Sequence, residues 1–341
     1  MLETIWFILW GVLWAGYFML DGFDLGVGTL MPFLARSDLD RRFMYNATGP
    51  FWDGNEVWLI TAGGATFAAF PRTYAVMFSG LYTALLLILF ALIVRGVAFE
   101  FRGKEESPTW RRVWDTCFFV GSFLPALLFG VAFANLFRGL PIDAQGIYRG
   151  TVFTLLNPYG LLGGVLFLLF FLVHGALWLA VKTPGELQAR AGALAGKLWY
   201  LLLAVAVVFL GASRFATDLY KNYYDYPLLF VIPLLAVVGL VLTKQFISQK
   251  KWWAAWFASC GAIVFSTFFG VVGLYPNMIP SIIDPHYSLT VFNSSSSPLT
   301  LKIMLVVAFI FVPIVILYQA WTYRLFRDKV TEKDMEYEEA Y

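Results

Sequence analysis

Long apolar stretches alternate with short polar connections along the whole chain. A stretch of about 20 apolar residues can cross a hydrocarbon core of roughly 30 Å as an α-helix. The pattern predicts an all-α polytopic membrane protein with nine transmembrane helices. The nine stretches cover approximately residues 5–34, 52–70, 76–99, 115–137, 154–180, 198–216, 227–247, 252–275 and 301–325.

The composition supports a single membrane domain over residues 1–341. Hydrophobic residues make up 60% of the chain and charged residues 13%, and the mean hydropathy is +0.72, which is outside the soluble range. The first apolar stretch lacks a basic leader and a small-residue cleavage site, so we expect it to be retained as a helix. No basic face of a soluble domain is available to bind nucleic acid. Cys117 and Cys260 lie inside apolar stretches and give no metal-binding spacing.

Lysine and arginine predict the orientation of the chain in the membrane. With the N-terminus outside, 18 of the 24 basic residues fall in inner connections or in the C-terminal tail. Because positive charge is retained on the cytoplasmic side, we expect an external N-terminus and a cytoplasmic C-terminus. An odd number of helices agrees with this arrangement.

Two carboxylates interrupt the first apolar stretch, in the segment DGFDLGVG. Asp21 and Asp24 are its only ionisable residues between Ile5 and Leu34. An acid at membrane depth costs about 2.5–3.5 kcal/mol, which favours a functional role. The two acids are three residues apart and therefore share one helix face. We do not expect both to be ionised at the same time unless a cation or water compensates their charge. The alternative is that they cap or kink a helix beside glycines, or lie in a polar loop.

A second pair of acids follows at the start of the next predicted helix. Asp53 and Glu56 are again three residues apart, within its first two turns. At a rise of 1.5 Å per residue, Asp21 and Asp24 lie ~24–28 Å along the first helix, near its cytoplasmic end. All four acids are therefore predicted to converge there as candidate proton carriers. The alternative to a proton-carrying role for Asp53 is plain capping of the helix, because the helix dipole favours a negative charge at the N-terminus.

Two further charges lie at predicted inner boundaries. Arg95 ends the third predicted helix, and Asp115 begins the fourth. They are candidates for electrostatic support, with Arg95 stabilising the ionised form of one of the acids. Snorkelling of Arg95 and capping by Asp115 are the structural alternatives.

The chain has two histidines, which are predicted to lie on opposite sides of the membrane. His174 is in the fifth predicted helix and His286 is in an outer loop. A haem with two protein ligands would need both, so we do not expect this chain to hold such a haem alone. His174 stays a candidate cofactor-binding residue, although an interhelical hydrogen bond is the commoner role for such a residue.

Five ordered motifs resemble subunit II of the cytochrome bd-type quinol:oxygen oxidases. They cover the first half of the chain densely, whereas the second half matches mainly by helix count and by its acidic, aromatic tail. The motifs are DGFDLGVG, GPFWDGNEVWLITAGGATFAAFP, LIVRGVAFEFRGK, GSFLPALLFGVAFANLFRGLPI and LLNPYGLLGGV.

The resemblance implies a terminal oxidase that oxidises quinol and reduces dioxygen to water in a bacterial or archaeal cytoplasmic membrane. A haem-bearing subunit I would ligate haem b and haem d, so no catalytic residue or metal ligand is expected in this chain. Small single-helix subunits, membrane lipid and a structural quinone are further expected partners. Asp24 and Asp53 match acids of a cytoplasmic proton-entry route, and Arg95 and Asp115 match a further charged pair.

The resemblance also implies how the helices are grouped. We expect a first four-helix bundle over about 1–137, a second over about 154–275, a ninth helix over about 301–325 and a cytoplasmic tail over 326–341. Two other functions fit the acids without the resemblance. One is a proton- or cation-coupled transporter, disfavoured because the acids lie at one end rather than at the midplane. The other is a structural assembly subunit in which the acids act as caps.

Overall fold

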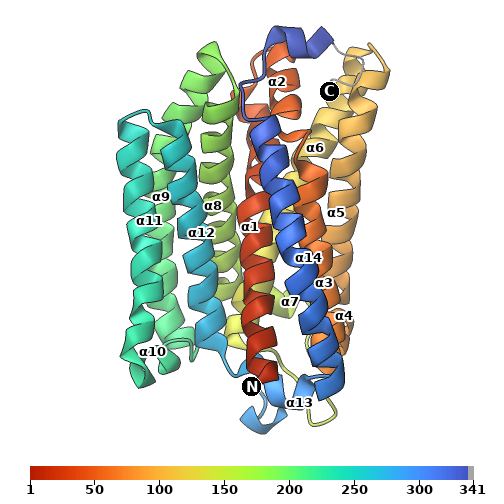
Figure 1. The fold of residues 1–341 in the computed structure, drawn as a ribbon, viewed down its shortest axis with the longest axis vertical. Coiled ribbons are helices and arrows are strands. Elements are labelled where there is room, and N and C mark those ends of the chain that lie inside the picture. Colours follow the sequence, from red (N-terminus) through yellow and green to blue (C-terminus); the bar gives the residue numbers. More distant parts are fainter. Residues whose placement is uncertain (337–341) are drawn as a thin grey trace.

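The computed structural model describes residues 1–336 as a set of long, roughly parallel helices (Figure 1). Positions 337–341 of the predicted tail lie outside the described residues. The long helices are α1 (Leu2–Leu34), α3 (Trp52–Ala69), α5 (Tyr82–Phe101), α6 (Pro108–Arg138), α8 (Pro158–Lys182), α9 (Gly185–Ala216), α11 (Val231–Ser248), α12 (Trp252–Leu274) and α14 (Pro298–Leu325).

Short elements connect the long helices at both ends. The short helices are α2 (Asp38–Thr48), α4 (Pro71–Gly80), α7 (Val152–Leu155), α10 (Lys221–Asp225) and α13 (Val291–Ser294), with 3₁₀ turns at Arg102–Lys104, Pro227–Phe230, Pro285–Tyr287 and Glu332–Glu336. Strands β1 (Asn277–Ile279) and β2 (Leu289–Thr290) pair antiparallel. The chain begins at one end of the molecule, the N-terminal end, and α2 marks the other, the α2 end (Figure 1).

Eight of the described helices are long and apolar enough to cross a membrane, and α3 is not one of them. Helix α3 has 18 residues, and two acids and three glycines lower its hydropathy. It ends where Pro71 begins α4, because a proline inside the helix would remove a backbone hydrogen bond. The structure also breaks the predicted stretch 76–99 at Leu81, between α4 and α5.

Three of the long helices begin with the same local sequence. A serine or asparagine is followed directly by proline at Ser107, Asn157 and Ser297, and each side chain accepts a hydrogen bond from the backbone N–H three residues later. Proline suits the first helical position because its missing N–H would have had no partner there. These local signals fix the starts of α6, α8 and α14.

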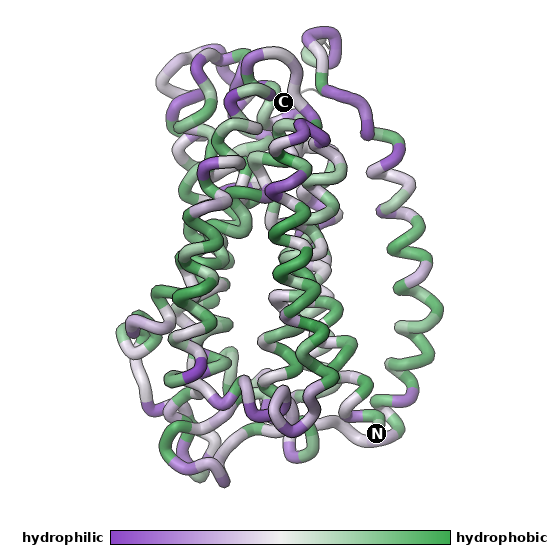
Figure 2. Tube along the Cα trace, turned by 90° about the vertical axis from the view of Figure 1, so that its left-hand side faces the viewer, coloured by the Kyte–Doolittle hydropathy of each residue, from purple (hydrophilic) through white to green (hydrophobic). Residues whose placement is uncertain are grey.

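Helix α1 is the central element of the fold. It packs against α3 and α6 on one side, against α8 and α12 on the other, and against α14. Helices α9 and α11 lie outside α8 and α12, and α5 lies beside α6 (Figure 1). Figure 2 shows hydrophilic residues gathered at both ends and a hydrophobic zone between them. This distribution is the one expected for a membrane-embedded bundle.

The glycines of the DGFDLGVG segment permit close helix packing and do not interrupt α1. A Cβ atom on Gly26 would lie 1.9 Å from the Phe171 carbonyl oxygen of α8, and one on Gly175 would lie 2.6 Å from the Gly26 backbone. A Cβ on Gly28 would lie 2.0 Å from Ser122 Oγ of α6. The interpretation of this segment as a loop or a helix cap is therefore wrong, because α1 continues through it without a break.

Replacing Gly26 should damage the α1–α8 crossing. In Gly26→Ala the new methyl group meets a backbone carbonyl that cannot rotate away, so we expect a cost of at least about 1–3 kcal/mol and a lower thermal midpoint. The matched control is Gly211→Ala in α9, where a Cβ would meet no atom within 4 Å. Thermal unfolding of both purified variants in detergent tests this, and equal midpoints would contradict it.

Candidate functional site

A buried guanidinium group joins three helices near the α2 end. Arg95 of α5 and Asp21 of α1 are both fully buried, and Arg95 Nη2 lies 2.8 Å from Asp21 Oδ1. The same nitrogen lies 3.0 Å from Oε2 of Glu56 on α3. A buried charge without a partner costs several kcal/mol, so the guanidinium group and the two carboxylates compensate one another here. We call Asp21, Asp24, Asn55, Glu56 and Arg95 the buried cluster.

Asp24 lies one turn further along α1 and has a different kind of partner. Its Oδ2 accepts a hydrogen bond of 2.7 Å from Nδ2 of Asn55, an uncharged amide on α3. Asp24 is 1% exposed, and it forms no ion pair with any described residue, whereas Arg95 pairs with Asp21 and Glu56. The two acids of α1 therefore share a face, as predicted, but they occupy different electrostatic environments.

The amide of Asn55 connects α1 and α3 to α14. Its Nδ2 donates to the carbonyl oxygen of Leu20 and to Asp24, while its Oδ1 accepts from Gln319 Nε2 at 2.9 Å and from the Tyr323 hydroxyl at 3.0 Å. All four hydrogen-bonding positions of this fully buried amide are used, which fixes its orientation. Gln319 and Tyr323 of α14 thus orient Asn55, and Asn55 in turn holds the carboxylate of Asp24 in place.

Several polar atoms in this region are buried without a hydrogen bond to a described residue. They are Asp21 Oδ2, Asp24 Oδ1, Arg95 Nε, Arg95 Nη1 and the Tyr17 hydroxyl. Buried polar atoms of this kind ordinarily bind ordered water. The cluster is therefore able to take part in a hydrogen-bonded chain that extends beyond its own side chains.

Exposure to solvent increases from the two acids of α1 to the two acids of α3. Asp53 is exposed, the Glu56 side chain is 21% exposed, and Asp21 and Asp24 are buried. The residue that precedes α3 is Phe51, and no side chain caps the helix by a hydrogen bond. Asp53 lies in the first turn, where the helix dipole favours it, but it is not a hydrogen-bonding cap.

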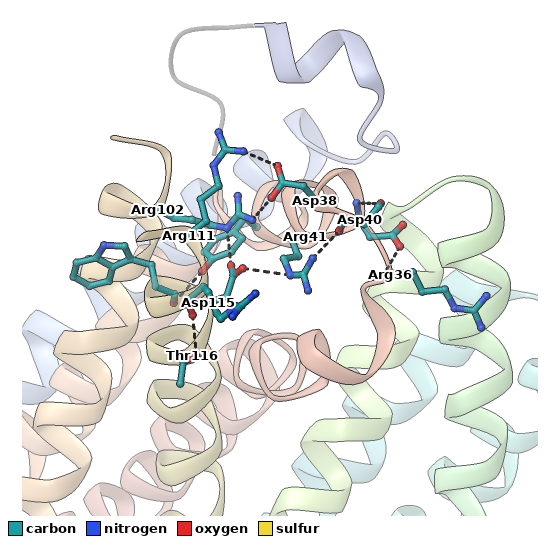
Figure 3. Close-up of polar contacts among 12 residues, drawn as sticks. Arg36, Asp38, Asp40, Arg41, Arg102, Arg111, Asp115 and Thr116 are labelled. Carbon is teal, nitrogen blue, oxygen red and sulfur yellow. Dashed lines mark hydrogen bonds and ion pairs between the residues drawn. The ribbon is translucent and has the colours of Figure 1, made fainter. Parts of the chain in front are cut away.

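Asp115 belongs to a separate network at the α2 end. Its carboxylate pairs with Arg102 at 2.6 Å and with Arg41 at 3.3 Å, and Arg102 also pairs with Asp38 of α2 at 2.5 Å (Figure 3). The charged pair that the resemblance implies for Arg95 and Asp115 is not formed by direct contact, because each has its own partners. Partial burial acts to raise the pKa of Asp38, but the hydrogen bond and charge of Arg102 outweigh it and lower that pKa.

His174 makes interhelical hydrogen bonds through both ring nitrogens. Its Nε2 lies 3.0 Å from the Met19 carbonyl oxygen of α1, and its Nδ1 lies 2.6 Å from Ser259 Oγ of α12. The ring also stacks on Trp256. His286 is 92% exposed in the loop before β2, at the N-terminal end. These two histidines therefore do not fit haem ligation within this chain.

Sequence reasoning missed the residues that position Asp24. Asn55, Gln319 and Tyr323 all lie in predicted helices, and the amides of Asn55 and Gln319 at membrane depth were the available signal. Among residues 1–336, no group of three histidine, cysteine or acidic side chains could hold a metal ion.

The fold and the buried cluster define a polytopic α-helical membrane subunit with an intramembrane carboxylate–guanidinium site. The chain belongs to the cytochrome bd terminal oxidase subunit II family, whose model matches residues 2–326. This membership removes the basis for the transporter interpretation.

Full-length relatives and one solved structure agree with this assignment. The chain is 41% identical to cytochrome bd ubiquinol oxidase subunit 2 of Bacillus subtilis over 98% of both chains. It is 39% identical to cytochrome bd-I ubiquinol oxidase subunit 2 of Escherichia coli, over 98% of this chain and 97% of that one. A chain of the bd oxidase from Geobacillus thermodenitrificans has the same fold, with a TM-score of 0.78 and 18% identity over 95% of this chain and 98% of that chain.

Removing the cation of the buried cluster should destabilise the protein. Arg95→Gln leaves Asp21 buried without its partner, and we expect a cost of about 3–5 kcal/mol and a clear drop in thermal midpoint. Adding Asp21→Asn should recover part of that loss, because the uncompensated charge is then removed. Arg149→Gln is the control, since Arg149 is largely exposed and its ion pair with Asp143 contributes little to stability. A double variant no more stable than Arg95→Gln would refute this account.

Proposed function

We propose that this chain is the subunit of a quinol-oxidising, dioxygen-reducing complex that carries protons inward from the cytoplasm. The observation behind this proposal is the order of burial from the exposed Asp53 through Glu56 to Asp21 and Asp24. In this proposal a haem-bearing subunit I holds haem b and haem d and carries out the redox chemistry. The names of the relatives, ubiquinol oxidase subunits, support this assignment.

The proposed topology has α3 as a ninth membrane-crossing helix, with the N-terminus outside and the α2 end in the cytoplasm of a bacterial cell. Large apolar side chains of α3 are exposed, Ile60 by 71% and Phe67 by 59%, which suits contact with lipid or another subunit. The eighteen residues of α3 would span about 27 Å. In this proposal α1, α3, α5 and α6 form one bundle and α8, α9, α11 and α12 form another. The packing of α1 against α3 and α6, of α8 against α9 and of α11 against α12 supports this grouping.

Asp21 and Asp24 have different roles in this proposal. Asp21 is the fixed counter-charge of Arg95, because it forms a direct, fully buried ion pair with that guanidinium group. Asp24 is the proton carrier, since its partner is the neutral amide of Asn55. Asn55 donates to Oδ2, so an incoming proton would reside on Oδ1 of Asp24. Asp53 collects protons at the surface, and Glu56 passes them inward. Uptake from the cytoplasmic side alone would make the oxidase reaction electrogenic.

A groove between α1, α12 and α14 is the proposed site of a structural quinone. Its volume is about 740 Å³, and most of its lining is apolar, with Trp58, Trp256 and Phe257 among the larger side chains. Gln319 and Arg324 supply polar groups near the α2 end of the groove. A flat ring with an isoprenoid tail has the matching chemistry of an apolar body with a few polar atoms.

Neutralising the proposed carriers should abolish turnover without dismantling the complex. Asp24→Asn keeps the shape and the acceptor for Asn55 but removes the titrating group, so quinol-driven oxygen consumption should fall by about 100-fold or more. Asp53→Asn should also lower it, and low pH should partly restore the activity, because a higher proton concentration replaces the lost surface acceptor. Haem absorption of the purified complex should be unchanged in both variants.

The control for this experiment is Asp225→Asn, at an exposed acid of α10 at the N-terminal end. Normal turnover in both test variants would leave the acids with a structural role only. If the unmodified chain purified without a haem-bearing partner and without a haem spectrum, the oxidase assignment itself would fail.

Filling the groove should displace the quinone. Ala320→Phe places a ring in the groove, whereas Val315→Phe places one on a part of α14 outside its lining. We expect the quinone extracted per purified complex to fall at least severalfold in the first variant and to stay constant in the second. Equal quinone content in the two variants would argue against this site.

A further inference from the structure

A second cavity lies at the α2 end, on the side of the molecule where α1 ends and α6 begins. Its volume is about 590 Å³, and it lies apart from the buried cluster. Its lining combines apolar side chains, Met31, Phe33 and Phe119, with the cations Arg41, Arg111 and Arg112. Figure 3 shows several of its charged residues at the top of the helices.

Three basic and three acidic residues line this cavity, and Arg102, outside the lining, adds a fourth cation by pairing with two of these acids. Asp38 and Asp115 are already paired, with Arg102, Arg41 and Arg111 as their partners. Glu106 is the third acid in the lining and Arg112 the remaining cation. With Arg102 behind them, four guanidinium groups therefore face three carboxylates, which leaves a net charge of +1.

Arg112 is the cation available to a ligand. Its side chain makes no ion pair or hydrogen bond with residues 1–336, and it is exposed. Next to it, Nε of Arg111 is buried and has no hydrogen-bond partner among the described residues. Planar guanidinium groups bind phosphate oxygens with two parallel hydrogen bonds, so these two arginines suit a phosphodiester.

One face of α6 changes from cationic to aromatic along its length. Four residues spaced by four, three and four positions lie on this face: Arg112, Thr116, Phe119 and Phe123. The stripe spans about 16 Å at 1.5 Å per residue. Phe119 packs against Phe33 of α1, which is 72% exposed, and against Phe123. This gradient matches a phospholipid whose headgroup lies at the arginines and whose acyl chains lie along the aromatic rings.

We propose that this cavity is a specific site for an anionic membrane phospholipid, such as phosphatidylglycerol. The phosphodiester contacts Arg112 and Arg111, and the acyl chains cover Phe33, Phe119 and Phe123. One negative charge neutralises the excess of +1, whereas the zwitterionic headgroup of phosphatidylethanolamine would leave it uncompensated. The site lies between the ends of α1 and α6 and adds a lipid contact beside the ion-pair network of α2 and α6.

The test uses the delipidated membrane complex that contains this chain, in detergent, and measures its thermal midpoint during titration with lipid. Phosphatidylglycerol should raise the midpoint more than phosphatidylethanolamine does, and inorganic phosphate should leave it unchanged. Arg112→Gln should weaken the apparent affinity for phosphatidylglycerol about tenfold, as expected for loss of a charged hydrogen bond. Thr116→Trp, which fills the cavity without changing its charge, should weaken it similarly.

The matched control is Arg138→Gln, the same substitution at an exposed position at the other end of α6. It should bind phosphatidylglycerol as the unmodified protein does. An equal response to inorganic phosphate would assign the site to free anions, and an equal response to phosphatidylethanolamine would remove the charge argument. Unchanged affinity in both Arg112→Gln and Thr116→Trp would overturn the proposal.

Discussion

The structure depends on the requirement that a charge buried among apolar helices must have a partner. Arg95 meets this requirement for α5 by contacting Asp21 of α1 and Glu56 of α3, so one guanidinium group fixes the relative positions of three helices. The same contact sets the electrostatics of the site, because it compensates one acid of α1 and leaves the other against an amide. Stability and the proposed proton chemistry therefore rest on the same side chain.

The second requirement is close approach of α1 to its neighbours. The glycines beside the two acids let α8 and α6 pack directly against the α1 backbone, so the acids are carried on the most enclosed helix of the fold. Acids on a peripheral helix such as α11 would face lipid instead. The segment DGFDLGVG thus combines two kinds of residue that need one another, acids that require enclosure and glycines that permit it.

Two charge networks of different kinds lie near the α2 end. The buried cluster has few partners and strict geometry, and its charges lie where dielectric screening is weak. The network of Asp38, Arg41, Arg102, Arg111 and Asp115 is partly exposed and shares its charges among several pairs, so loss of one contact leaves others (Figure 3). The first arrangement suits control of individual protons, and the second suits attachment of α2 to α6 at the membrane surface.

The sequence by itself determined the class of the fold, most of the helices and the acids that lie at membrane depth, because hydropathy and helical periodicity are local properties of the chain. It also pointed to the family through five ordered motifs. It did not determine which charge meets which: Asp115 contacts Arg102 and not Arg95, and Asn55, Gln319 and Tyr323 were not singled out. Periodicity assigns a side chain to a helix face, but only the packing of helices distant in sequence decides what that face contacts. The role of the glycines likewise followed from packing between helices, which hydropathy does not record.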